Sequence, residues 1–306
     1  MLDHRNIKSL AAGIGFDDCG IAPCRHMPDN ESRYRSWIDR GWQSSLAYME
    51  RHADKRFDPR RLVEGARTAV VCLVAYKNPL GDGYSPEHRT RVASYAVAED
   101  YHTTLRQMLR RLLEALCARY PGLRGRAFTD TAPLAEKQLA VDAGLGWIGR
   151  QSLLVTPRFG SYVLLGELLL TDETDRYDTP LEGVGCGSCR RCIEACPTGA
   201  VSEERMIDTA RCISCHTVEQ EPGERIDLHG WIFGCDACQS CCPYNRRAPM
   251  HRNPAFDPLF DPRTMGRDEW LGMDEGAFET LCGRTPLSRT GLERIRRHVL
   301  RNTEKP

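Results

Sequence analysis

Short apolar and β-branched runs alternate, in the first half of the chain, with segments whose apolar residues recur every three or four positions. The runs predict β-strands and the recurring segments predict helices. Strands are expected at residues 68–76, 91–97, 125–129, 152–156 and 162–170, and helices near 3–14, 31–40, 44–51, 100–120 and 133–143. Pro157 to Gly160 separate the last two strands and predict a hairpin turn, with glycine where a positive φ is needed.

The pattern divides the chain into three parts. Residues 1–175 are expected to form a mixed α/β domain, residues 176–249 a cysteine-rich domain and residues 250–306 a helical extension packed on the core. The fold class is therefore α+β. The extension is basic near its end, which is equally typical of a solvated helix face and of an RNA-facing surface. The arginines concerned are Arg289, Arg294, Arg296, Arg297 and Arg301.

Composition narrows the classes of protein that the chain can represent. The 306 residues include 42 basic and 42 acidic side chains, which argues against a surface devoted as a whole to nucleic acid. No apolar run approaches the roughly 20 residues that span a bilayer. The N-terminal residues carry no apolar signal region, so a cytoplasmic protein without membrane contact is expected.

Cysteine spacing gives the strongest chemical signal. Ten of the 15 cysteines fall between Cys186 and Cys242, a clustering that favours metal or redox chemistry over structural disulfides. Residues 186–197 follow the pattern C-x2-C-x2-C-x3-C-P, which is typical of bacterial ferredoxins with two [4Fe-4S] clusters. Tetrahedral zinc sites also use C-x2-C pairs, but this longer run is unusual for zinc. We therefore predict a ferredoxin-like domain.

In ferredoxins of this type the fourth cysteine of each run ligates the other cluster. The preferred partition assigns Cys186, Cys189, Cys192 and Cys242 to cluster 1, and Cys196, Cys212, Cys235 and Cys238 to cluster 2. Cys215 remains an alternative to Cys212, and Cys241 an alternative to Cys242. Cys242 is preferred because a proline follows it, as a proline follows Cys196.

Several motifs together resemble the epoxyqueuosine reductase family. They are DYH at 100–102, DTAPLAEK at 130–137, AGLGWIGR at 143–150, GS at 160–161, LGEL at 165–168, RCIS at 211–214, GCDACQ at 234–239, CPYN at 242–245 and GRTPLSRTG at 283–291. The resemblance runs from about residue 5 to about residue 300. It is to a short form of the family, without the C-terminal helical-repeat domain that helps many relatives hold tRNA.

The resemblance implies a cobalamin between the α/β domain and two [4Fe-4S] clusters. It also implies reduction of epoxyqueuosine to queuosine at the wobble position of tRNA, the last step of queuosine biosynthesis. A low-potential donor such as flavodoxin or ferredoxin would supply electrons to a monomeric enzyme. Two alternatives remain open: a cobalamin and iron–sulfur reductase of a small molecule, as in reductive dehalogenases, and a two-cluster electron carrier without catalysis. Dehalogenases usually carry a twin-arginine leader, and none is seen here.

The resemblance also assigns roles to individual residues. Asp130 is the expected acid for the epoxide oxygen, with a pKa raised by burial against the corrin, although an aspartate before a helix is often only a cap. Lys137 is expected to meet tRNA. Cofactor contacts are expected from Arg56, Tyr95, Tyr101, His102, Asp130, Leu154, Ser161, Leu165 and Ser214.

Overall fold

A four-stranded antiparallel sheet organises the N-terminal half of the protein. The computed structural model describes residues 1–80, 83–219 and 226–303. The strand order is β1 (Asp18–Pro23), β2 (Thr68–Ala75), β7 (Val163–Leu170) and β4 (Gly125–Phe128). Every residue of β2 is buried, because helices cover both faces of the sheet. This explains why β2 appears in the sequence as an unbroken apolar run.

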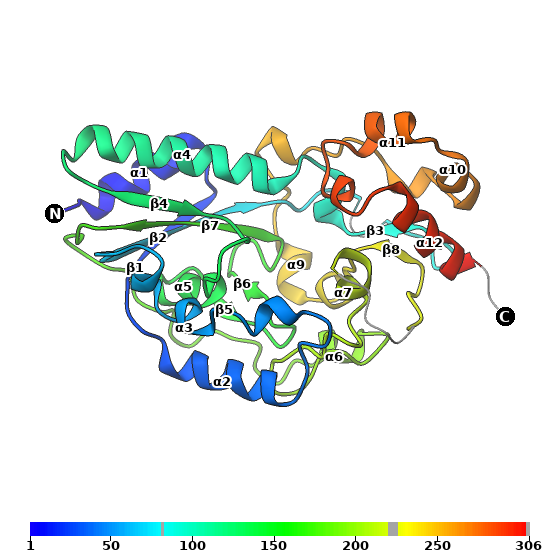
Figure 1. Ribbon diagram of the computed structural model, residues 1–306, viewed down its shortest axis with the longest axis horizontal. Coiled ribbons are helices and arrows are strands. Elements are labelled where there is room, and N and C mark those ends of the chain that lie inside the picture. The colour runs from blue at the N-terminus through cyan, green and yellow to red at the C-terminus, as the bar shows by residue number, and fades with distance from the viewer. Residues whose placement is uncertain (81–82, 220–225, 304–306) are drawn as a thin grey trace.

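Two helical layers sandwich the sheet (Figure 1). Helices α1 (His4–Ile14) and α4 (Tyr101–Arg119) pack on one face, where Leu105, Leu109 and Leu112 are fully buried with alternate residues of β2. The other face carries α5 (Glu136–Asp142), with α2 (Pro28–Asp39) and α3 (Ala53–Arg56) beyond it. The small antiparallel pair β5 (Trp147–Ile148) and β6 (Leu154–Val155) follows α5.

The cysteine-rich segment consists of short helices and loops. Its helices are α6 (Arg191–Glu194), α7 (Ile213–Val218), α8 (Ala237–Ser240) and α9 (Pro243–Arg247). Strand β8 (Trp231–Phe233) pairs in parallel with β3 (Arg91–Val92), so this segment is joined to the first half of the chain by backbone hydrogen bonds. Such pairing places the cysteines beside the α/β sandwich.

The C-terminal segment packs on this junction. Helices α10 (Arg267–Gly272), α11 (Glu275–Cys282) and α12 (Leu292–Thr303) enclose a core with β3 and β8, and Ile295 and Val299 are fully buried there. The His298 ring shares a 2.8 Å hydrogen bond with the Ile232 carbonyl. In the described ranges, no helix combines the length and the apolar character needed to cross a membrane.

A buried polar network ties the cysteine-rich segment to the sandwich. The Asn245 side-chain oxygen accepts a 2.6 Å hydrogen bond from the Ser161 N–H, and its amide nitrogen donates to the Ser161 hydroxyl and to the Gln239 carbonyl. The Ser161 hydroxyl donates to Gln239 Oε1 at 2.9 Å. All three residues are buried, so these bonds satisfy groups that would otherwise be costly to bury.

Several predicted elements differ from the structure. Residues 91–97 are a strand only at Arg91–Val92, because the Ser94 N–H then donates to the Asp236 carboxylate and the chain continues as a 3₁₀ turn. Residues 152–156 and 162–170 do not form the predicted hairpin: β6 pairs with β5, whereas β7 pairs with β2 and β4. Residues 44–51 contain only a 3₁₀ turn at Ala47–Met49.

Strand β1 was missed by the sequence pattern because it contains glycine and ends at proline. Gly20 is required there, since a Cβ at this position would collide with the backbone of Ala143 at the end of α5. Helix α5 itself begins at Glu136, three residues after the predicted start. The other predicted helices and the strands β2, β4 and β7 are confirmed within a few residues.

Substitution of Gly160 tests the junction. Gly160 has φ +60°, and a Cβ would press on the Asn245 side chain and its backbone nitrogen. We expect Gly160→Ala to destabilise the protein by about 1–3 kcal/mol, through steric overlap and an unfavourable φ. Thermal unfolding under anaerobic conditions measures this. Gly13→Ala in α1, where a Cβ meets nothing within 4 Å, is the matched control and should be neutral or stabilising. Equal melting temperatures for the two variants would contradict the expectation.

Candidate active site

Asp130 lies at the end of β4, on the wall of a large cavity. Its φ is +55°, a conformation that non-glycine residues rarely adopt and that turns the chain sharply before α5. The cavity has a volume of about 1160 Å³ and is lined from α2, α3, α5 and β5. The Asp130 side chain is 55% exposed toward it. A strained aspartate thus faces a space large enough for a substrate or cofactor.

Two neighbours on α4 hold the Asp130 carboxylate. The Tyr101 hydroxyl donates to Asp130 Oδ2 at 2.7 Å, and His102 Nε2 lies 3.0 Å from the same oxygen. The other ring nitrogen of His102 lies 2.8 Å from Asp100 Oδ1. Asp100 also caps α4 by accepting the His102 N–H. The N-terminal cap of the helix is therefore the group that orients the imidazole.

Arg289 completes this arrangement from the C-terminal segment. Its guanidinium forms a 2.8 Å ion pair with the Asp100 carboxylate, and Nη1 lies 3.2 Å from His102 Nε2. From the sequence, Arg289 is one of the basic residues of the C-terminal extension, and no role at the site is predicted for it. Arg289 belongs to the GRTPLSRTG motif at 283–291, which was a local signal, but its position in the cavity wall follows from the packing of the C-terminal segment.

The electrostatics of Asp130 differ from the sequence-based prediction. Burial works to raise its pKa, as expected, but the hydrogen bonds from His102 and Tyr101 outweigh burial and leave the pKa below its usual value. The prediction of a raised pKa is wrong for the protein alone. For His102, burial works to lower the pKa, while bonds to Asp100 and Asp130 raise it overall. The proton of this pair is therefore held mainly on the imidazole.

Two further carboxyl groups, the partly buried Glu136 and the fully buried Glu167, lie near Asp130. Glu136 Oε1 accepts the Asp130 N–H at 2.7 Å and so helps to fix the strained backbone. Glu167 on β7 is fully buried and faces Glu136. Burial and the nearby Asp130 raise the pKa of Glu136 to about 7, and burial and Glu136 raise the pKa of Glu167 further. Ionisation of either carboxyl group opposes ionisation of the other, which favours retention of a proton by the pair.

The cavity wall also carries basic and aromatic groups. Lys137 donates to the Ser152 carbonyl at 2.7 Å, and burial lowers its pKa. The Arg56 guanidinium lies 5.5 Å from the Tyr34 ring centroid. Arg56 Nε and Trp147 Nε1 are buried, and neither has an acceptor among residues 1–80, 83–219 and 226–303. Two such donors indicate a ligand that carries acceptor groups.

The remaining predicted cofactor contacts lie away from this wall. Tyr95 packs against Tyr101 with ring centroids 6.1 Å apart, and neither tyrosine lines the cavity, although Tyr101 donates to Asp130, which does. Leu154 and Ser161 are buried, and Leu165 is partly buried in the core beneath α5. Ser214 lies in α7. Their expected contacts with a cofactor stay predictions.

The cysteines separate into two groups by their mutual electrostatic influence. Cys186 and Cys189 influence the pKa of the Cys192 and Cys242 thiols. Cys196 and Cys212 influence the pKa of the Cys235 and Cys238 thiols. The division is the same as that of the predicted ligand sets, and the assignment of these cysteines as cluster ligands stays a prediction. The cysteine that acts most strongly on Cys215 is Cys212. Cys241 lies near Cys189, Cys192 and Cys242, so it remains a neighbour of the first group.

The fold and these groups define a redox protein with an α/β catalytic domain and an adjoining domain for two iron–sulfur clusters. Residues 185–245 match the family model described as "4Fe-4S double cluster binding domain", and residues 56–131 match "Epoxyqueuosine reductase QueG, DUF1730". The chain is 37% identical to the epoxyqueuosine reductase of Cyclobacterium marinum, over 96% of this chain and 94% of that protein. It is 32% identical to the epoxyqueuosine reductase of Pseudomonas aeruginosa, over 96% of this chain and 83% of that protein. The chain therefore belongs to the epoxyqueuosine reductase family.

Solved structures of this family share the fold. An epoxyqueuosine reductase with a tRNA-Tyr epoxyqueuosine-modified stem loop superimposes with a TM-score of 0.86 and 26% identity, covering 97% of this chain and 80% of that one. A second solved structure is that of a Bacillus subtilis epoxyqueuosine reductase with an aspartate catalytic loop swung out of the active site. It superimposes with a TM-score of 0.85 and 27% identity, covering 97% of this chain and 80% of that one. In the present chain the strained φ of Asp130 lies in the loop that follows β4.

Removal of the buried proton gives a pH test of the carboxyl pair. In the unfolded chain a glutamate titrates near 4.5, so as pH rises toward 7 the folded protein keeps a proton that the unfolded chain has lost. This raised pKa makes stability decline over that interval, by up to about 1.4 kcal/mol per pH unit and proton. We expect Glu167→Gln to flatten the decline of melting temperature between pH 5 and 8. Glu114→Gln, at an exposed site on α4, should keep the wild-type slope. A wild-type slope in Glu167→Gln would refute a proton retained by this pair of carboxyl groups.

Proposed function

We propose that this protein is an oxidoreductase that reduces epoxyqueuosine to queuosine at the wobble position of tRNA. The observation that carries the proposal is Asp130, held by Tyr101 and His102 on the wall of the 1160 Å³ cavity. A hydrogen-bonded carboxyl group at a cavity wall is suited to give a proton to an epoxide oxygen. Family membership supplies the substrate, and the two-cluster domain supplies the route for electrons.

Cobalamin is the proposed cofactor of the cavity. The cavity exceeds the roughly 300–1,000 Å³ that is usual for small ligands, which fits a cofactor as large as a corrin. The orphaned donors Arg56 Nε and Trp147 Nε1 fit the amide oxygens at the rim of a corrin. Bound cobalamin would supply a strongly nucleophilic cobalt centre of low potential. Arg56, His102 and Asp130 would contact it from the cavity wall.

The protein's own residues would hold the proton and transfer it to the substrate. The 3.0 Å bond between His102 Nε2 and Asp130 Oδ2 allows the proton to rest on the imidazole and to pass to the carboxylate as the epoxide oxygen gains charge. Asp100 keeps the ring in place through the other ring nitrogen, and Arg289 in turn holds Asp100 by an ion pair. Glu136 holds the Asp130 backbone, so the carboxyl group stays aimed at the cavity. Asp130 and His102 thus act as one proton-donating unit.

The tRNA would present its anticodon loop to the same cavity. A wobble base in a loop can be splayed out at little cost, which brings its modified ring to Asp130. Lys137 lies in the cavity wall next to Glu136 and would face the RNA. Arg33, Arg51 and Arg205 add positive charge to the wall and are suited to phosphate contacts.

The proposed cluster ligands are those of the two cysteine groups, with Cys212 preferred to Cys215. Cys212 is among the main electrostatic influences on the pKa of both Cys235 and Cys238, whereas Cys215 is not among them for either thiol. We expect Cys212→Ser to lose about half of the iron after anaerobic reconstitution, and Cys215→Ser to keep it. Iron and sulfide analysis with EPR of the reduced protein measures both. Retained iron in Cys212→Ser, with loss in Cys215→Ser, would reverse the assignment.

Asp130→Asn tests the reaction and the acid together. Reconstituted protein is incubated anaerobically with cobalamin, a strong reductant and tRNA that carries epoxyqueuosine, and the digested nucleosides are weighed. Wild type should give a nucleoside lighter by one oxygen, and Asp130→Asn should lower the rate by about 10²–10⁴-fold because the asparagine amide cannot serve as the acid. Cluster content and tRNA binding should be unchanged in the variant. Product formed at the wild-type rate by Asp130→Asn, or without cobalamin, would refute the proposed acid or the proposed cofactor respectively.

A further inference from the structure

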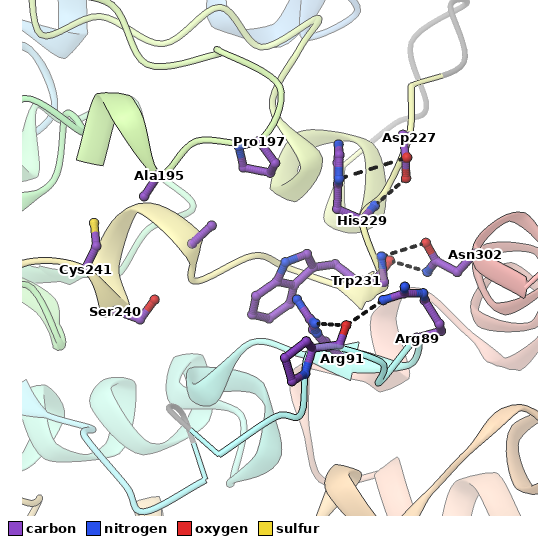
Figure 2. A pocket seen from close by; sticks show the side chains of 13 residues that line it. Arg89, Arg91, Ala195, Pro197, Asp227, His229, Trp231, Ser240, Cys241 and Asn302 are labelled. Carbon is purple, nitrogen blue, oxygen red and sulfur yellow. Dashed lines mark hydrogen bonds and ion pairs between the residues drawn. The ribbon is translucent and has the colours of Figure 1, made fainter. Parts of the chain in front are cut away.

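A second cavity, of about 600 Å³, lies at the junction of the cysteine-rich segment with β3 and β8. Figure 2 shows Trp231 between Arg91 on one side and Ala195 and Pro197 on the other. In the described part of the chain, its lining shares no residue with the wall that contains Asp130. The two cavities are therefore separate openings, and nothing in the proposed proton chemistry uses this one.

The lining of the second cavity comes from the segments that carry the proposed cluster ligands. Ala195 directly precedes Cys196, and Ala237 lies between Cys235 and Cys238. Cys241, which directly precedes Cys242, also lines the cavity. Arg91 lies within electrostatic range of Cys235. A molecule in this cavity would thus touch the chain on either side of ligands of both clusters.

The charges of the cavity favour an acidic partner. Arg89 donates to the Pro86 carbonyl at 2.7 Å, and Arg91 donates to the Ser85 and Pro86 carbonyls. Across the described ranges, neither arginine has a carboxylate within ion-pair distance, so carbonyl oxygens orient both guanidinium groups without neutralising them. The acid in the lining is Asp227, which lies 4.0 Å from the His229 ring.

We propose that this cavity is the docking site for a small acidic electron carrier of the flavodoxin class. The inference rests on the proposed function, because reduction of an epoxide to an alkene and water consumes two electrons and two protons. A reduced flavodoxin passes from hydroquinone to semiquinone and delivers one electron in each encounter, so one turnover needs two encounters. Electrons would enter the clusters here, while the other cavity remains available to tRNA. Small interfaces of this kind are common for transient electron transfer.

Charge reversal at Arg89 tests the docking site, because the residue is exposed and outside the proposed catalytic groups. Anaerobic stopped-flow absorbance follows the bleaching of the clusters in holoprotein mixed with reduced flavodoxin. We expect Arg89→Glu to lower the second-order rate constant about tenfold at low ionic strength, with a smaller effect as salt screens the charges. Arg106→Glu, on the exposed side of α4 and outside both cavities, is the matched control and should keep the wild-type rate.

Photoreduced deazaflavin, which is too small to need a docking surface, separates docking from cluster damage. Under the proposal it reduces Arg89→Glu and wild type equally, and both then convert the tRNA equally. Equal rates of reduction by flavodoxin in Arg89→Glu and Arg106→Glu would overturn the docking site, as would the absence of any reduction of wild type by flavodoxin. Slow reduction of Arg89→Glu by deazaflavin would also overturn it. So would weaker tRNA binding by Arg89→Glu with unchanged flavodoxin kinetics. Failure of deazaflavin-reduced wild type to convert tRNA would instead count against the proposed function.

Discussion

The buried hydrogen bonds among Ser161, Gln239 and Asn245 are the constraint on which the arrangement of the whole protein depends. They join the turn before β7 to helices α8 and α9, which lie on either side of Cys242. Because each group is buried, a shift of either side would leave polar atoms without partners, at a cost of about 1–3 kcal/mol for each. Gly160 allows the close approach, since any side chain there would displace Asn245. The cysteine-rich segment is thereby fixed relative to the sheet.

The same principle governs the acid at the cavity. Burial is not the only influence on the pKa and position of Asp130. Tyr101 and His102 donate to its carboxylate, and Glu136 accepts from its backbone N–H. These bonds keep the resting carboxyl group ionised and place the proton one bond away, on His102. Entry of a large apolar cofactor would strengthen the desolvation that already opposes ionisation, and so favour transfer of the proton to Asp130. The neighbouring donor His102 thus allows Asp130 to be ionised in the empty cavity and to become protonated when the cavity is filled.

The sequence indicated the parts of the protein that depend on local spacing. The cysteine run, the buried strand β2 and the amphipathic helix α4 are visible as patterns, and Asp130, His102 and Lys137 lie at one cavity as expected. Contacts between distant segments were not visible. Arg289 comes to His102 across 187 positions, and Glu167 comes to Glu136 through strand pairing. Both residues lie in motifs of the family, but the motifs alone did not indicate these contacts. Tyr95, Ser161 and Leu165 support the site from within the packing, and the domain boundaries at residues 175 and 249 stay predictions.

Separate openings also resolve a conflict that the chemistry creates. The proton-donating pair must be shielded from bulk water when tRNA is bound, because an epoxide that gains charge must meet Asp130 and not solvent. An electron carrier must, in contrast, come and go twice in each turnover, which requires an exposed surface with weak, salt-sensitive attraction. Arg89 and Arg91, held by backbone carbonyls beside the cysteine-rich segment, would provide such a surface without involving the wall that holds Asp130. The two-cluster domain would then connect this electron entrance to a site of reduction that bound tRNA shields from solvent.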